Sequence, residues 1–422
     1  PETFSYTTSE IMAMNMPLAV FDIGAPAERV KDYARGAVLP LGASPAEILE
    51  SLKALAKRCG IFEQPVKRRK VLFLMELESY ATRYRIEHFR EQLAVAGYAS
   101  DCLELEKDLK VDLKGYSSVV LYRLTDIAFT EKLAAQARAL SVPVYYDIDD
   151  LVFDYDKISY LEFLKGRDYQ NFRQMTQQVH RCMELSDGFI TSTETLAEEL
   201  RAEFPEKPVT VRRNVCSMEM QILSAEAYEN RTEEGEIVRI GYFSGSHTHD
   251  RDFAVVEELL VEIMQKYPNV HLVMGGVFDT VRFDSYQERI TKLPFMDWQK
   301  LPEAIANTDI NLMPLEDTRF HACKSENKWM EAALVHVPSI LSANEEMRRV
   351  IKDGEDGILC ADEQQWREGL TRLIEDGELR RTIAENAHRT VLERYTTDGT
   401  GRAAIKLVLG YQQHMDRSEK ND

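Results

Sequence analysis

The sequence predicts an α/β protein with two doubly wound domains, each built on a parallel sheet. Two observations carry this prediction. Apolar strand-like segments alternate with amphipathic helical segments over residues 70–193, and the same alternation restarts at residue 237. Strands and helices alternating at this length are typical of a parallel sheet covered by helices on both faces. Ligands of such sheets bind beyond the carboxyl ends of the strands, so the cleft between the domains is the default site.

The first series begins with the apolar strand VLFLM at 71–75. The pattern then predicts strands at 118–123, 142–150 and 188–193, and helices near 84–97, 131–140 and 167–186. Around residues 209–216 the alternation stops. The acidic stretch AEAYENRTEEGE at 225–236 is typical of a solvated linker, which separates the two series.

The second series begins with IVRIGYFSG at 237–245. Further strands are predicted at 270–276, 310–315, 337–341 and 357–360, with helices near 250–266, 299–307 and 325–335. After residue 360 only helices are expected, and the last of them covers 399–415.

Composition limits the class of protein. A chain of 422 residues is too long for one ordinary core, which favours two or three domains. The formal net charge of −19 argues against a nucleic-acid partner, whose phosphates would be repelled. No apolar run approaches the ~20 residues of a membrane-spanning helix, so we expect a cytoplasmic protein and leave peripheral attachment to a membrane open. The six cysteines include no CxxC pair, so neither a structural zinc site nor a disulfide scaffold is indicated.

The first residues of the chain repeat a later segment. When residues 1–50 are moved along the chain by 321 positions, they fall without a gap on the segment that starts at Ala322. The coinciding residues are Glu10 with Glu331, Pro17 with Pro338, Lys31 and Asp32 with Lys352 and Asp353, and Gly36 with Gly357. Internal similarity of this kind indicates duplication. We therefore expect residues 1–64 to be the tail of a second domain of the same kind, from a longer polypeptide with two tandem copies. The alternative is a chance resemblance between two βα units.

Two segments carry a resemblance to a known family. KSENKWMEAALVHVPSILS at 324–342 and IKDGEDGILC at 351–360 resemble the donor-binding half of retaining glycosyltransferases of the GT-B architecture, the large group related to family 4. The opening PETFSYTTSE resembles this group more closely, because Glu2 and Glu10 have its E-x7-E spacing. Cys323 stands at the position that matches Glu2 and departs from the pattern. VYYDIDDLVFD at 144–154 and GYFSGSHTHDRDF at 241–253 look like stretches of bacterial members that build surface polysaccharides.

This resemblance implies a domain plan and a reaction. Residues 65–220 would form the N-terminal acceptor domain, 221–395 the C-terminal donor domain, and 396–422 a terminal helix that crosses back to the N-terminal domain. The reaction would be metal-independent and retaining transfer of a hexosyl or deoxyhexosyl group from a nucleotide sugar to a glycan or lipid-linked acceptor. No cofactor is expected, and the further partner would be the upstream glycosyltransferase domain.

The donor site is predicted at two places in the second series. Backbone amides of the loop 245–250 and a nearby lysine could stabilise the leaving diphosphate without a metal. The resemblance implies that Lys328 contacts the diphosphate and that Glu331 contacts the ribose hydroxyls. Without the resemblance, the two residues are interpreted as a surface ion pair that contributes little to stability. The predicted donor-binding residues are Gly245, Ser246, His247, Arg251, Lys324, Glu326, Asn327, Lys328 and Glu331.

The acceptor site is predicted in the first series. Asp149 and Asp150 end a strand in the DIDD motif, and their carboxylates could orient an acceptor hydroxyl, act as a base or bind a metal, although a structural role is also open. Tyr84 and Arg85 are further acceptor candidates, and Arg83 is a candidate for a lipid phosphate. The catalytic set predicted is Lys328, Glu331, Asp149 and Asp150. Trp298 and Trp329 are interpreted as packing residues, and His321 as a structural one.

Three other functions compete with sugar transfer. A non-catalytic sugar-nucleotide-binding or scaffold module is favoured by Cys323, which stands where a glutamate is common. A sugar-nucleotide epimerase shares the architecture but needs a cluster of acids and bases around the sugar. A nicotinamide dehydrogenase is disfavoured because no strand is followed by GxGxxG.

Overall fold

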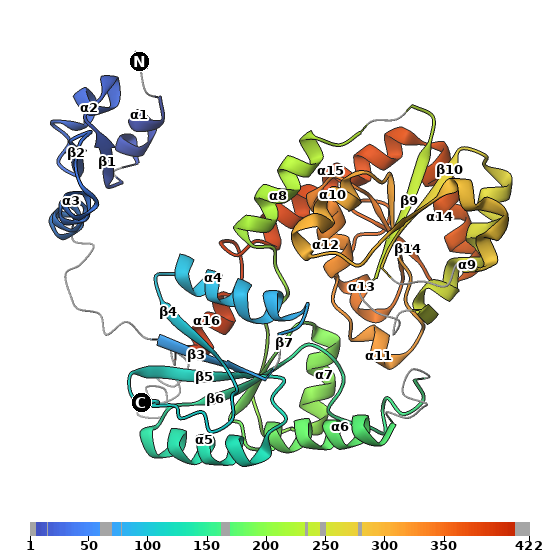
Figure 1. Ribbon diagram of the computed structural model, residues 1–422, viewed down its shortest axis with the longest axis horizontal. Coiled ribbons are helices and arrows are strands. Elements are labelled where there is room, and N and C mark those ends of the chain that lie inside the picture. The colour runs from blue at the N-terminus through green and yellow to red at the C-terminus, as the bar shows by residue number, and fades with distance from the viewer. Residues whose placement is uncertain are drawn as a thin grey trace, which may run out of the picture. The chain divides into compact units, whose positions relative to one another are not determined.

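The computed structural model describes residues 6–14, 16–59, 70–76, 78–161, 169–232, 235–244, 250–276 and 281–409. The chain divides into two compact units, Pro1–Arg68 and Arg69–Asp422. Figure 1 shows the elements of both units.

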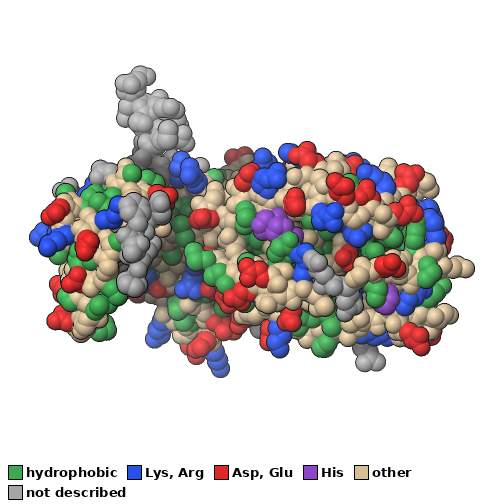
Figure 2. All heavy atoms as spheres, turned by 90° about the horizontal axis from the view of Figure 1, so that it is seen from above, with side chains coloured by type: hydrophobic (Ala, Val, Ile, Leu, Met, Phe, Trp, Pro, Cys, Tyr) green, Lys and Arg blue, Asp and Glu red, His purple; other side chains and the backbone are tan. Residues whose placement is uncertain are grey.

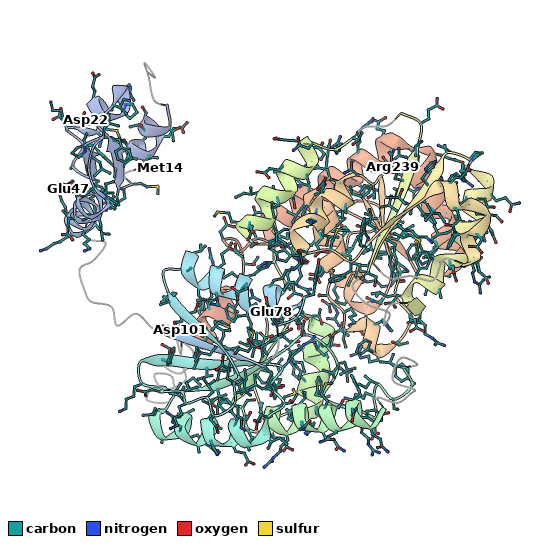
Figure 3. All side chains as sticks on the ribbon, in the orientation of Figure 1. Met14, Asp22, Glu47, Glu78, Asp101 and Arg239 are labelled. Carbon is teal, nitrogen blue, oxygen red and sulfur yellow. The ribbon has the colours of Figure 1, made fainter. Side chains whose placement is uncertain are left out.

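The first unit is a small α/β unit with one two-stranded sheet. It contains α1 (Tyr6–Ala13), β1 (Leu18–Phe21), α2 (Gly24–Val30), β2 (Gly36–Leu39) and α3 (Pro45–Arg58). The two strands pair in parallel, with Leu18 opposite Gly36. Helix α3 begins at a capping box, in which the Glu47 carboxylate accepts a hydrogen bond of 2.8 Å from the Ser44 amide. Met14 and Glu47 of this unit are labelled in Figure 3.

The elements of this unit coincide with elements of the second unit at the spacing of 321 residues. Helix α1 and strand β1 fall on α12 (Asn327–Leu334) and β13 (Ser339–Ser342), residue for residue. The packing also corresponds. A Cβ at Gly36 would lie 2.5 Å from Val30 Cγ1, and a Cβ at Gly357 would lie 2.7 Å from Ile351 Cγ2, which is the matching position. The same close approach therefore requires glycine in both segments.

The second unit contains two parallel sheets of six strands each. The first sheet consists of β3 (Lys70–Met75), β4 (Ala99–Glu104), β5 (Tyr116–Tyr122), β6 (Val144–Ile148), β7 (Gly188–Thr191) and β8 (Val209–Val211), in the order β4-β3-β5-β6-β7-β8. Its helices are the π-helical turn η1 (Arg83–Glu87), α4 (His88–Val95), α5 (Ile127–Leu140), α6 (Tyr169–Glu184) and α7 (Glu194–Glu203). The predicted first series is thus a doubly wound parallel sheet.

The second sheet consists of β9 (Val238–Phe243), β10 (Val270–Gly275), β11 (Ile290–Leu293), β12 (Ile310–Met313), β13 and β14 (Ile358–Cys360), in the order β11-β10-β9-β12-β13-β14. The helices that accompany this sheet are α8 (Met218–Glu229), α9 (Asp250–Lys266), α10 (Leu301–Ala306), α11 (Arg319–Ala322), α12, α13 (Glu345–Val350), α14 (Glu363–Glu375) and α15 (Gly377–Arg394). Two 3-10 turns, η4 (Val281–Arg289) and η5 (Trp298–Lys300), belong to the same half.

Both faces of the first sheet are buried, as its sequence pattern predicts. In β3, Leu72 and Leu74 belong to the core on one face, while Val71 and Phe73 belong to the core on the other. A strand buried on both faces has no polar side, which explains the continuous apolar run VLFLM.

The chain crosses between the two sheets twice, and the crossings lie side by side. The Cys216 amide donates to the Tyr395 carbonyl at 2.7 Å, and the Thr397 amide donates to the Cys216 carbonyl at 3.2 Å. After the second crossing, α16 (Arg402–Val408) packs on the first sheet, where the Ser118 hydroxyl donates to the Val408 carbonyl at 2.6 Å.

The predicted linker was wrong in part. Residues 225–229 of the stretch 225–236 are the end of helix α8. Ser217 caps the start of this helix, because its hydroxyl accepts from the Met220 amide at 3.1 Å, and the Met220 side chain is buried. A cap and a buried apolar contact therefore outweigh the acidic composition. The pattern also missed β4, β8 and β11, which are edge strands of the two sheets. The alternation of the first series therefore continues to Val211, although it was expected to stop around residues 209–216.

Acidic and basic side chains are interspersed over the face of the molecule shown in Figure 2. None of the helices in the described part of the chain combines the length and the apolar character that a membrane crossing requires.

Candidate functional site

Ion pairs and hydrogen bonds join the two sheets where their strands end at the cleft. Lys324, which precedes α12, donates to the Asp150 carboxylate at 2.6 Å. On the same α12 segment, the Glu331 carboxylate accepts hydrogen bonds from both the Tyr84 hydroxyl and the Arg83 guanidinium. The structure therefore brings predicted donor residues and predicted acceptor residues together.

Lys328 occupies the second position of α12, three residues before Glu331 on the same helix. Its ammonium lies 4.5 Å from the ring centroid of Tyr242 in β9. The Asn311 amide donates to the Lys328 carbonyl at 3.3 Å and to the Ser339 hydroxyl at 3.0 Å, which fixes the start of α12 against the sheet. Burial lowers the pKa of Lys328 to about 8, although the nearby carboxylates of Asp252 and Glu331 oppose this shift. A partly buried ammonium next to a helix N-terminus is suited to bind an anion.

Asp147 of the DIDD motif is paired inside the first sheet. Arg85 Nε donates to Asp147 Oδ1 at 2.7 Å and Arg85 Nη2 to Oδ2 at 2.9 Å, and both side chains are almost wholly buried. Arg85 also donates to the Asn214 side chain at 3.0 Å, and Asn214 in turn donates to Asn327 at 3.0 Å. Arg85 thus has no exposed surface for an acceptor, and it instead links the strand ends to the start of α12.

Asp149 and Asp150 follow β6 and share one arginine. Arg123 Nε donates to Asp149 at 2.7 Å, and Arg123 Nη2 donates to Asp150 at 2.6 Å. Burial alone would raise the pKa of Asp150, but the cations of Lys324 and Arg123 outweigh it and hold this pKa well below its usual range. Arg123 has a φ of 51°, in the left-handed region that side-chain-bearing residues rarely adopt. Such strain clusters at functional sites, and no local signal in the sequence indicated this residue.

A cavity of about 240 Å³ lies beside these aspartates, between the two sheets. Its wall is mostly apolar and includes Val152, Phe172, Met175, Val179 and Phe320, with Arg123, Thr125, Asp150, His321 and Lys324 as polar lining. The cavity is thus an apolar space next to the Lys324–Asp150 ion pair.

Two other predicted donor residues form ion pairs with residues other than Lys328. Glu326 is buried and pairs with Arg213 at 3.1 Å. Arg251 is half-exposed on α9 and lies 3.4 Å from Glu316. Gly245, Ser246 and His247 lie outside the described residues, so the predicted phosphate loop is not placed.

His321 lies in helix α11, and Cys323 directly follows this helix. The Cys323 side chain is buried in the first-sheet core, and burial raises the pKa of its thiol to about 12. His321 Nδ1 and the Thr318 hydroxyl form a hydrogen bond of 2.6 Å, and His321 Nε2 lies 3.2 Å from Asp252 Oδ1. Among the described residues, Asp252, Glu316 and His321 are close enough together to hold a cation. Since His321 and Asp252 also fix this loop to α9, the structural interpretation of His321 accounts for these contacts.

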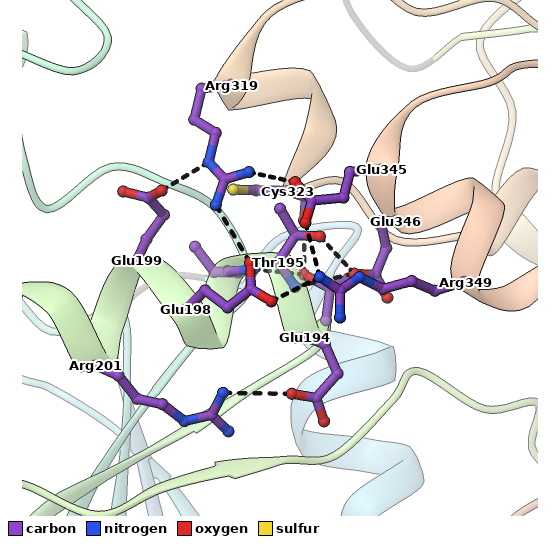
Figure 4. Close-up of polar contacts among 12 residues, drawn as sticks. Glu194, Thr195, Glu198, Glu199, Arg201, Arg319, Cys323, Glu345, Glu346 and Arg349 are labelled. Carbon is purple, nitrogen blue, oxygen red and sulfur yellow. Dashed lines mark hydrogen bonds and ion pairs between the residues drawn. The ribbon is translucent and has the colours of Figure 1, made fainter.

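A second set of contacts joins the sheets at the start of α7. The buried Glu346 carboxylate accepts from the Thr195 amide at 2.9 Å and from its hydroxyl at 2.8 Å. Figure 4 shows the surrounding ion pairs, in which Arg319 contacts Glu199 at 2.6 Å and Arg349 contacts Glu198 at 2.6 Å. The exposed pairs contribute little each, whereas the buried carboxylate at a helix N-terminus fixes the two sheets at this point.

The comparisons with known proteins concern the fold and the family likeness of the chain. Residues 251–405 match a family model described as glycosyl transferase-like. Among solved structures, sucrose-phosphate synthase from Thermosynechococcus elongatus is 14% identical and has a TM-score of 0.54, covering 83% of this chain and 100% of that chain. HepE from Anabaena, solved in complex with UDP, is 14% identical with a TM-score of 0.51, covering 83% and 100%.

WaaG, a glycosyltransferase involved in lipopolysaccharide biosynthesis, is 12% identical with a TM-score of 0.51, covering 81% of this chain and 100% of that chain. No curated protein sequence matches the chain. At these identities the structural likeness is evidence of fold, while the family match covers most of the second sheet and its helices. The second unit therefore has the predicted GT-B fold, and over residues 251–405 it is similar to the glycosyl transferase-like family.

Proposed function

We propose that this protein is a retaining glycosyltransferase of polysaccharide or glycolipid assembly, which moves a hexosyl or deoxyhexosyl group from a nucleotide sugar to a glycan or lipid-linked acceptor. The observation that carries the proposal is the half-buried Lys328 ammonium, located three residues before Glu331 at the start of α12 and facing β9. UDP is the first nucleotide to test, because the similar HepE structure contains UDP.

The proposed chemistry places the leaving diphosphate beside Lys328. As the bond between the anomeric carbon and the diphosphate oxygen breaks, negative charge grows on that oxygen, and a preorganised cation stabilises it. The acceptor oxygen then bonds to the same face of the anomeric carbon, and its proton passes to the departing phosphate. Asp149 and Asp150 already accept hydrogen bonds from Arg123. This pairing favours a role in orienting the acceptor over a role as the base.

The acceptor is proposed to approach from the first sheet. The apolar cavity beside Asp150 and Lys324 has room for part of a sugar or an attached apolar group. Tyr84 and Arg85, predicted to contact the acceptor, are proposed instead to position η1 and α12, because both are buried and engaged with Glu331 or Asp147. The proposal needs no metal, although Asp252, Glu316 and His321 offer cation ligands.

The first unit is proposed to be the carboxyl-terminal part of a second glycosyltransferase-like domain. The coincidence of α1 with α12 and of β1 with β13 supports this origin. Thr7 stands where Lys328 stands in the complete copy, while Glu10 matches Glu331. The fragment thus retains the glutamate and lacks the lysine.

The test is nucleotide binding followed by turnover. Thermal melting with UDP, ADP and GDP should identify one nucleotide that stabilises the protein, by about 2.7 kcal/mol at 100 times its Kd. The corresponding nucleotide sugar should then be consumed only when an acceptor is present, with or without EDTA. Binding without consumption would favour the scaffold alternative, for which the buried Cys323 in place of a glutamate is the supporting feature. Reaction without any acceptor would indicate the epimerase.

The pH dependence of UDP binding provides a second test. Because burial lowers the pKa of Lys328 to about 8 in the free protein, the ammonium loses its proton above that pH. A bound diphosphate favours the charged form and raises this pKa, so binding takes up a proton and the Kd rises with pH. Isothermal titration from pH 7.5 to 9.5 should show a Kd that weakens by up to about tenfold per unit above pH 8.

Lys328→Arg is the matched control, because a guanidinium stays charged throughout this range. Its Kd for UDP should stay level with pH. A wild-type profile as level as that of Lys328→Arg would exclude Lys328 from the diphosphate site.

A further inference from the structure

Three side chains with metal-binding atoms converge near the end of strand β12. Asp252 comes from α9, Glu316 from the loop that follows β12, and His321 from α11. One carboxylate oxygen or imidazole nitrogen of each lies within 4.8 Å of those of the other two. Asp252 and His321 are almost wholly buried, while Glu316 is partly exposed. The cluster therefore joins α9 to the segment after β12, and Glu316 connects it to solvent.

His321 has the orientation of a metal ligand. Its Nδ1 is engaged with the Thr318 hydroxyl at 2.6 Å, so Nε2 is the nitrogen that faces Asp252, 3.2 Å from Oδ1. Metal-binding histidines generally make such a hydrogen bond through the other ring nitrogen, which fixes the ring and its tautomer. Two ligands that each lie about 2.0–2.1 Å from a tetrahedral Zn²⁺ are separated by about 3.3 Å. The distance between Nε2 and Oδ1 thus fits two ligands of one ion.

The two carboxylates of the cluster favour a cation between them. Like charges this close disfavour each other, and the ionised Asp252 is buried, where a charge is costly unless it is paired. Arg251 lies 3.4 Å from Glu316 but is half-exposed, so solvent weakens its contribution. A hydrogen bond between His321 and Asp252 accounts for those two side chains and not for the approach of Glu316.

We propose that Asp252, Glu316 and His321 form a binding site for a divalent transition metal, with Zn²⁺ as the ion that fits best. One imidazole and two carboxylates suit Zn²⁺, whereas Mg²⁺ and Ca²⁺ prefer oxygen ligands alone. The partly exposed Glu316 side chain turns toward the other two ligands, and water completes the coordination. The inference does not rest on the proposed function, because these three side chains alone define the site.

The role proposed for the ion is structural. The His321 carbonyl accepts from the Asn344 side chain at 3.1 Å and from the Lys324 amide at 3.1 Å. Phe320, His321 and Lys324 together line the cavity beside Asp150. A metal that ties His321 to α9 therefore fixes this wall of the cavity. The expected consequence of binding is a more stable protein and not a chemical step.

The test is Zn²⁺ binding to the full chain after treatment with EDTA and removal of the chelator. Isothermal titration of wild type should show one site per chain, and Zn²⁺ should raise the melting temperature, because it binds the folded state. Glu316→Gln removes one ligand charge at a partly exposed position. It should weaken Zn²⁺ at least tenfold, since even partners outside the coordination sphere contribute about 10–100-fold. Mg²⁺ at the same concentration should not displace Zn²⁺.

Glu203→Gln is the matched control. His180 lies 3.0 Å from Glu203 through Nε2 and 3.7 Å from Glu184 through Nδ1. Because these two carboxylates lie at opposite nitrogens of the ring, they do not share one ion with His180. Glu203→Gln should therefore bind Zn²⁺ with the Kd of wild type.

Co²⁺ in place of Zn²⁺ identifies the ligands by their absorption. Cys59 and Cys102 are partly buried free cysteines, and thiolates also bind Zn²⁺. Co²⁺ at the proposed site should absorb in the visible range without a thiolate charge-transfer band. Asp252→Asn, which keeps an acceptor for the Glu316 amide, should abolish this spectrum. Circular dichroism establishes that each variant is folded.

The outcomes separate this inference from the proposed function. A wild-type protein that binds no Zn²⁺ after EDTA treatment overturns the inference. Equal Kd values for wild type and Glu316→Gln, or a thiolate band in the Co²⁺ spectrum that Glu316→Gln retains, place the ion elsewhere and overturn it as well. The proposed function is decided instead by the binding and turnover of nucleotide sugars, which these results leave unchanged.

Discussion

Replacing Lys328 by alanine should lower kcat for sugar transfer by about 10²–10³-fold, the usual effect of removing one preorganised group that stabilises developing negative charge. Lys328 is held in place by the Asn311 contact to its carbonyl and by the Tyr242 ring near its ammonium. These contacts fix the start of α12 and place the ammonium in the unliganded protein, which is the preorganisation that the proposed role requires. The measurement is the rate of nucleoside diphosphate release from the donor that the binding test identifies, at saturating donor.

The matched control is Lys352→Ala, which removes an exposed lysine of the same sheet domain that pairs with Glu355. This variant should keep its kcat within about twofold, since exposed ion pairs contribute little. Circular dichroism of both variants should match that of wild type. A Lys328→Ala enzyme with near wild-type kcat would overturn the role proposed for Lys328.

Replacing Arg85 by alanine should reduce the free energy of unfolding of the second unit by about 3–5 kcal/mol, because it leaves the Asp147 carboxylate buried without its partner. Arg85 donates to both oxygens of Asp147, and neither side chain has appreciable exposure. The buried Arg212 remains nearby, but the hydrogen bonds described for it go to Gln92 and to the Tyr84 carbonyl. Urea unfolding followed by circular dichroism measures the change.

Two variants make this result interpretable. Arg138→Ala removes an exposed arginine of α5 and should change the free energy of unfolding by less than about 0.5 kcal/mol. The double variant Arg85→Ala with Asp147→Ala removes both charges and should be less destabilised than the sum of the two single variants, since contacting groups are coupled. If Arg85→Ala behaves like Arg138→Ala, the buried pair does not stabilise this sheet.

The alternation of apolar strands with helices determined the fold class. Both the spacing of apolar residues in the helices and the continuous apolar runs of strands buried on two faces are local properties of a sequence. The positions of β3, β6, β9 and β12 follow from their apolar runs. Strands β4 and β11 escaped this pattern because they lie at sheet edges and are only partly buried. Their position depends on pairing with a neighbour, which no local pattern records.

The predicted placement of Lys328 and Glu331 on one helix depended only on helical spacing, and α12 has this geometry. The partners of these residues could not be derived in the same way. Glu331 is bonded to residues 83 and 84, which lie 248 and 247 positions away in the sequence. A charge in a sequence identifies neither its partner nor its burial, because both depend on how the two sheets meet.

The sequence by itself therefore determined the two parallel-sheet domains, the repeat of residues 1–50 and the Lys328–Glu331 pair. Only the tertiary structure decided that Arg85 is buried against Asp147, that Arg123 holds Asp149 and Asp150, and that Arg83 donates to Glu331. The physical reason is that spacing and apolar pattern act over one or two turns of chain. The ion-pair partners of long cationic side chains instead depend on which carboxylates folding brings near them, and these come from distant strand ends.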